Sequence, residues 1–114
     1  MNKDNILMLA EHLDTLSGAH FDQGHYAYCG SPSCIAGHAV HLSGQWLGED
    51  GTRQLASEGI AIAREWLGLD GWTADELFTE HPRGVLAENV SARDAAVTLR
   101  HLALTGEVDW LVGR

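Results

Sequence analysis

Both cysteines of the chain lie within thirteen residues of two histidines, in the order Cys29-x4-Cys34-x3-His38-x2-His41. On a helix the last three side chains fall within ~60° of one another, because each residue turns the direction by ~100°. Thiolate and imidazole groups are the ligands that zinc prefers. Cys34 and His41 are ~10 Å apart along such a helix, however, which is beyond their comfortable joint reach of one ion. A zinc site would therefore use Cys29, Cys34 and His38, with His25, His41 or water as the fourth ligand.

A second hypothesis makes Cys34 a nucleophile. In the first turn of a helix, unpaired N–H groups stabilise a thiolate, and His38 one turn later can act as a base. This pair would serve a cysteine-dependent hydrolase or transferase. The sequence offers no paired carboxylate and no oxyanion-binding loop to complete such a site.

Two further interpretations involve neither metal binding nor catalysis. Cys29 and Cys34 can close a short loop as a disulfide, although a reducing compartment makes such bridges uncommon. Alternatively, both cysteines are small buried apolar groups, while His38 and His41 bond to backbone or loop partners beside a helix.

The elements that must position these residues are a loop and a helix. Residues 19–30 show no sustained period and are rich in aromatic and polar side chains, which is typical of an irregular, function-bearing loop. The following helix start adds N–H donors. We expect this region to contact a small ligand or a partner protein through these side chains: His25, Tyr26, Tyr28, Ser31, Ser33, Cys34, His38 and His41.

Apolar residues recur at helical spacing in several segments, whereas β-branched residues are scarce and never alternate with polar ones over four or more positions. We therefore expect an all-α, compact single domain over residues 1–114, with four to five short helices and the aromatic, histidine-rich loop before the second. The first three expected helices cover residues 6–16, ended by Gly18; 31 to about 42, begun by Ser31 and Pro32; and 60–67, ended by Gly68. A short fourth helix would begin at the capping box Thr73 to Glu76. A fifth would begin at the box Ser91 to Asp94 and end at Thr105 and Gly106.

The charge balance restricts the partners. Seven Lys and Arg against sixteen Asp and Glu give a net charge of −9, which opposes binding to nucleic acid or to anionic lipid. The longest apolar stretches are far shorter than the ~20 residues that cross a bilayer. The N-terminal residues show no secretory pattern, so we expect a cytoplasmic protein. The four tryptophans are candidates for closing the core, for caging a ligand or for a homodimer face: Trp46, Trp66, Trp72 and Trp110.

The segment Cys29-Gly30-Ser31-Pro32-Ser33-Cys34-Ile35-Ala36-Gly37-His38-Ala39 resembles the core motif of a family of small, uncharacterised bacterial and phage proteins, Cys-Gly-Ser/Thr-x-x-Cys-x-x-Gly-His/Trp-Ala. Phe21-Asp22 upstream is similar to the usual lead-in of that family. Trp66-Leu67-Gly68-Leu69 and Leu77-Phe78 look like its second block. Because the resemblance allows tryptophan at the position of His38, it implies a structural role there rather than a zinc ligand.

The sequence thus favours a non-enzymatic binding module that acts through residues 19–41 on a small molecule or a partner protein. The resemblance implies an association with phages or mobile elements. The alternatives are a small zinc protein that uses Cys29, Cys34 and His38, and a cysteine-dependent enzyme that uses Cys34 and His38. We expect no cofactor; zinc would be bound only under the first of these alternatives.

Overall fold

The computed structural model describes residues 1–16, 21, 23, 27–28, 31–45, 56–79, 82–86 and 89–112. Within these ranges the chain forms five helices and one short antiparallel pair of two-residue strands, in which Tyr28 faces Ser31. The prediction of an all-α fold with four to five helices is confirmed. The elements are α1 (Lys3–Asp14), β1 (Ala27–Tyr28), β2 (Ser31–Pro32), α2 (Ile35–Leu42), α3 (Ala56–Leu67), α4 (Gly71–Phe78) and α5 (Ala92–Thr105).

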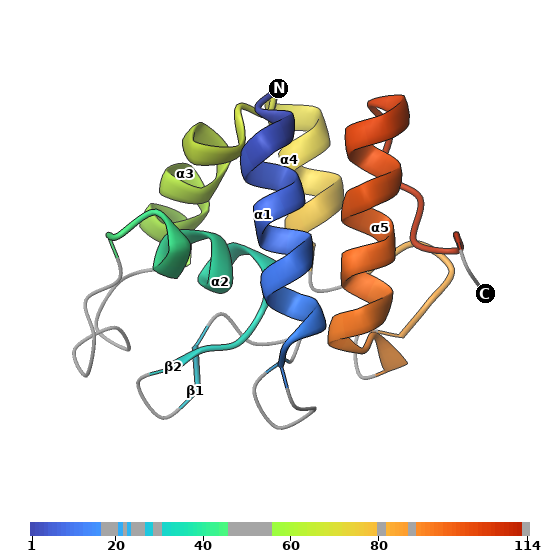
Figure 1. The fold of residues 1–114 in the computed structure, drawn as a ribbon, viewed down its shortest axis with the longest axis horizontal. Coiled ribbons are helices and arrows are strands. Elements are labelled where there is room, and N and C mark those ends of the chain that lie inside the picture. Colours follow the sequence, from blue (N-terminus) through green and yellow to red (C-terminus); the bar gives the residue numbers. More distant parts are fainter. Residues whose placement is uncertain are drawn as a thin grey trace.

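The helices surround one hydrophobic core. Helices α1 and α5 pack along each other and run in opposite directions, α2 packs on α3, and α4 stands behind α1 (Figure 1). Leu9 and Leu13 of α1 and Leu99 and Leu102 of α5 are fully buried in the same cluster. None of the helices in the described ranges is long and apolar enough to span a bilayer.

Helix α5 begins and ends as predicted. The Ser91 hydroxyl accepts the N–H of Asp94, and the Asp94 carboxylate accepts the N–H of Ser91, which is the expected capping box. Gly106 ends the helix in the left-handed conformation, with φ of +81°. The local sequence signals at both ends of α5 were therefore sufficient to predict where this helix begins and ends.

The prediction that a capping box at Thr73 opens α4 is wrong. The helix begins three residues earlier, because the Asp70 carboxylate accepts the N–H of Thr73 at 2.7 Å and takes the cap position. Aspartate caps a helix as well as threonine does. The earlier start places Trp72 in the first turn of α4.

The predicted start of α2 is also wrong. Ser31 and Pro32 are extended in β2, and the cap is Cys34, whose sulfur accepts the N–H of Gly37 at 3.5 Å. Proline has no N–H to donate, so it is tolerated in a two-residue edge ladder as readily as in a first helical turn. Helix α1 ends at Asp14, earlier than expected, and α3 already begins at Ala56.

A buried glutamine joins the end of α4 to the start of α2. Gln23 is 1% exposed, and its side-chain amide donates to the carbonyls of Leu77 at 3.1 Å and Thr79 at 2.9 Å. Its oxygen accepts the N–H of Ile35 at 3.4 Å. One side chain therefore satisfies backbone groups left without partners at two helix ends.

Candidate functional site

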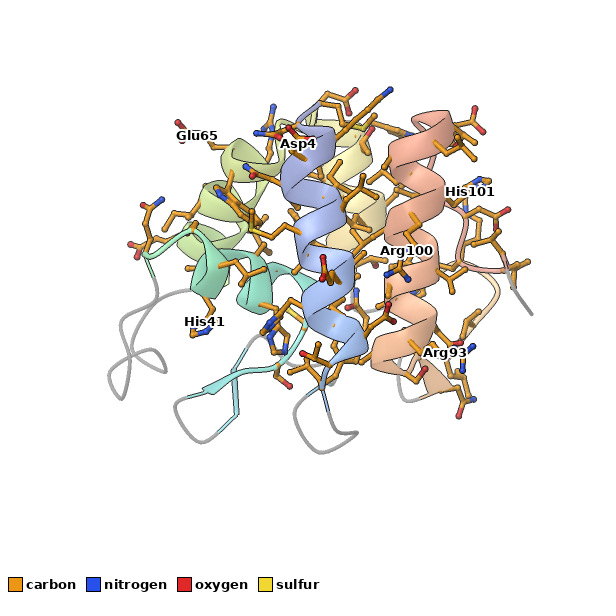
Figure 2. All side chains as sticks on the ribbon, in the orientation of Figure 1. Asp4, His41, Glu65, Arg93, Arg100 and His101 are labelled. Carbon is orange, nitrogen blue, oxygen red and sulfur yellow. The ribbon has the colours of Figure 1, made fainter. Side chains whose placement is uncertain are left out.

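The first candidate site is a histidine cluster between α1 and α2. Helix α2 carries His38, which is 2% exposed, and His41, which is exposed and projects from its underside (Figure 2). Helix α1 contributes His12, which is half-buried in its last turn. The ring of His12 lies 5.2 Å from that of His38 and 6.1 Å from that of His41, measured between centroids.

The contacts within this cluster require two of its histidines to share one hydrogen bond. Nε2 of His12 and Nδ1 of His38 are 3.2 Å apart, so one of these nitrogens donates an N–H and the other accepts it. The ring of Phe21 stacks on His38 with an interplanar angle of 16°. His38 is therefore clamped between an aromatic ring and a second imidazole.

The surroundings of His12 favour its neutral form. Partial burial removes water from the imidazole and lowers its pKa, and the charge of His41 nearby lowers this pKa further. A neutral imidazole has a lone pair, which can accept a hydrogen bond or bind a metal ion.

The described residues contain no group of three or more His, Cys, Asp or Glu side chains placed to hold a metal ion. Of the zinc ligands predicted from the sequence, Cys34 and His38 are described, whereas Cys29 and His25 lie outside the described residues. The zinc hypothesis stays a prediction, and so does a disulfide between Cys29 and Cys34.

The sulfur of Cys34 has a structural task. It is 6% exposed, at the cap position just before α2, where it accepts the N–H of Gly37. A helix N-terminus favours a thiolate, as the nucleophile hypothesis requires. The position of Cys34 nevertheless leaves little of the sulfur for a substrate to reach.

The remaining predicted contact residues are only partly described. Ser33 is 4% exposed. Tyr28 and Ser31 are placed by their backbones in the β1–β2 pair, and Tyr26 lies outside the described residues.

His12 is the member of the cluster that the sequence did not single out. It lies 26 positions before His38, and only the fold brings the two together. One signal was present, because His12 adjoins the buried Leu13 and follows the buried Leu9 by three positions. A polar side chain at the edge of an apolar helix face is well placed to touch the neighbouring element.

The second candidate site is a groove between α4 and the chain that follows α5. A hollow of about 350 Å³ is lined by one side of α4 together with Arg83 and residues 108–111. A second hollow of about 370 Å³ adjoins it and shares Trp72, Glu76 and Val108. We call the two hollows together the α4 groove. Its residues are Trp72, Thr73, Asp75, Glu76, Thr79, Arg83, Gly106, Glu107, Val108, Asp109, Trp110 and Leu111.

Specific contacts hold residues 108–111, which form the side of the groove opposite α4, in place. Trp110 is 5% exposed, and its indole N–H donates to the Glu76 carbonyl at 3.0 Å. The Thr98 hydroxyl donates to the Asp109 carbonyl at 3.4 Å. Leu111 packs against Gly84, where an added Cβ would come within 3.2 Å of it. The chain after α5 is thus tied to both α4 and α5.

The α4 groove presents apolar surface in an acidic setting. Trp72 is 73% exposed and Leu111 is 53% exposed. Among the described residues that line the groove, Asp75, Glu76, Glu107 and Asp109 carry carboxylates and Arg83 carries a guanidinium.

This groove was not predicted from the sequence, in which the tryptophans were candidates for the core, for a ligand cage or for a dimer face. The buried residues of α4 are Ala74, Leu77 and Phe78. Trp72 precedes Ala74 by two positions, ~200° around the helix, and so faces away from the core.

Comparisons of the chain with protein-family models, with curated proteins and with solved structures found no match.

Proposed function

We propose that this protein is a non-enzymatic interaction module that binds a partner through the α4 groove. The observation that carries this proposal is Trp72, whose large indole is 73% exposed beside a hollow of about 350 Å³. Tryptophan contributes more binding energy than most side chains when a partner covers it. The Leu111 side chain, also exposed, extends the apolar surface across the groove.

The described side chains of residues 19–41 give weaker support for a contact surface there. Ser33, Cys34 and His38 are buried, so a partner at that surface would meet His41. Burial in a folded core is expected for groups that stabilise the fold. We therefore place the partner at the α4 groove.

Selection of short peptides from a random library on the immobilised protein tests this function. We expect selected peptides to lose at least tenfold in affinity for the Trp72→Ala variant, since a buried tryptophan anchor contributes ~2 kcal/mol or more. The Leu104→Ala variant is the matched control, because Leu104 is 83% exposed and lies outside the groove. Failure to select peptides, or equal binding to wild type and Trp72→Ala, would refute the proposal.

A small zinc protein is the second candidate, favoured by the separation of 3.2 Å between Nε2 of His12 and Nδ1 of His38. Two nitrogens bound to one tetrahedral zinc at ~2.0–2.1 Å are also ~3.3 Å apart. The described residues place no third ligand beside this pair, so side chains outside them, Cys29 and His25, would complete the set. Elemental analysis of the untagged protein tests this candidate. If the protein binds zinc here, the analysis should find about one zinc per chain, and the His12→Ala variant should lose it. Less than about a tenth of a zinc per chain would rule this candidate out.

A further inference from the structure

The charge and shape of the α4 groove indicate what kind of partner it fits. We propose that the groove binds an extended protein segment in which basic side chains flank an apolar one. This inference rests on the proposed function and adds the chemistry of the partner to it.

The electrostatic part of the argument starts from the lining of the groove. The described part of the lining holds four carboxylates and one guanidinium, and the whole chain carries a net charge of −9. Arg83 offsets only one of these charges: its side chain is 88% exposed, and its guanidinium lies 3.8 Å from the Glu76 carboxylate. Lysine and arginine side chains of a partner are attracted to such a surface.

Trp72 adds a second attraction for the same groups. Its indole is a lining residue of both hollows and is mostly exposed. A cation above an indole face is attracted by the electrons of the ring, and arginine in particular stacks on it. An apolar side chain of the partner can contact Leu111 and Val108 in the same groove.

The shape of the groove favours an extended chain over a small molecule. The two hollows adjoin at Trp72, Glu76 and Val108. In an extended segment, side chains on one face recur every ~6.6 Å, so neighbouring ones can enter adjoining hollows. A drug-sized ligand is usually enclosed more completely in a single pocket.

A second copy of this chain is a poor occupant. A twofold contact at the α4 groove would bring Asp75, Glu76, Glu107 and Asp109 close to the same residues of the other copy. Like charges across an interface oppose association. Nucleic acid is disfavoured for the same reason.

Three synthetic peptides of one length, each with a central leucine flanked by lysine, glutamine or glutamate, test the inference on the full chain. Fluorescence anisotropy gives the affinities, and we expect the lysine peptide to bind at least about tenfold more tightly than the glutamine peptide, with further weakening at high salt. Asp75→Lys should weaken the lysine peptide by about tenfold. Glu65→Lys is the matched control, an exposed acid on α3 across the molecule from the C-terminal chain (Figure 2); it should change the affinity less than about twofold.

The outcomes separate the inference from the proposed function. If glutamine or glutamate peptides bind as tightly as the lysine peptide and lose affinity with Trp72→Ala, the interaction module stands and the basic partner is overturned. If none of the three binds, or Trp72→Ala binds all of them like wild type, both are overturned. A dimer in sedimentation that Trp72→Ala abolishes would also overturn the basic partner, in favour of a second copy.

Discussion

Replacing Gln23 by methionine should destabilise the fold more than any surface substitution. Methionine has nearly the same length and shape as glutamine but cannot replace its hydrogen bonds. The change leaves the carbonyls of Leu77 and Thr79 and the N–H of Ile35 without the partner that the buried amide supplies.

The size of the effect follows from these three contacts. The two bonds of 2.9 and 3.1 Å are worth about 1 kcal/mol each, and the longer third contact about half of that, so the free energy of unfolding should fall by about 2–3 kcal/mol. For 114 residues, 1 kcal/mol corresponds to about 4 °C in Tm. We therefore expect Tm to fall by about 8–12 °C.

Thermal unfolding followed by circular dichroism measures this difference. The matched control is Gln45→Met, because Gln45 is an exposed glutamine after α2 and its replacement should change Tm by no more than about 2 °C. If Gln23→Met and Gln45→Met have the same Tm, Gln23 does not join α4 to α2 as described.

Three further predictions concern stability. In urea unfolding, Gly68→Ala should lower the free energy of unfolding by about 1 kcal/mol or more beyond the loss in Gly44→Ala. Both glycines have positive φ, but only at Gly68 would the new Cβ lie 2.8 Å from a backbone atom, the nitrogen of Asn2. Equal losses would contradict this close approach. Ser91→Ala should lower the free energy of unfolding by about 1 kcal/mol through loss of the α5 cap, and an unchanged urea midpoint would argue against the capping box. Because the folded state lowers the pKa of His12 below its ordinary 6.5, its neutral form contributes stability above pH 6.5 that is lost as the pH falls through the folded pKa. Urea unfolding at pH 7 and pH 5 should show a smaller loss for His12→Gln than for wild type, and identical losses would refute the assignment.

The sequence predicted those elements whose signals are local. The box at Ser91 and the stop at Gly106 specify α5 without reference to the rest of the chain. Two competing signals explain the errors at other helix starts. Asp70 caps α4 three residues before Thr73, and Pro32 suits a strand edge as well as a helix start.

The candidate sites depend on contacts between distant segments, which one sequence does not reveal. His12 meets His38 across 26 positions, and Trp110 reaches the Glu76 carbonyl across 34. Cys34 and His38 lie one helical turn apart at the start of α2, where the N–H of His38 donates to the Cys34 carbonyl at 3.0 Å. Their burial, by contrast, is a consequence of packing by other helices.

The most direct test of the binding role is the NMR signal of the Trp72 indole N–H, assigned by its absence from the spectrum of Trp72→Phe. Titration of the full chain with the leucine peptide flanked by lysine should shift this signal progressively to saturation. The indole N–H of Trp110, which is buried in the wall of the groove and donates to the Glu76 carbonyl, should move less. A Trp72 signal that stays unchanged throughout the titration would contradict binding at the α4 groove.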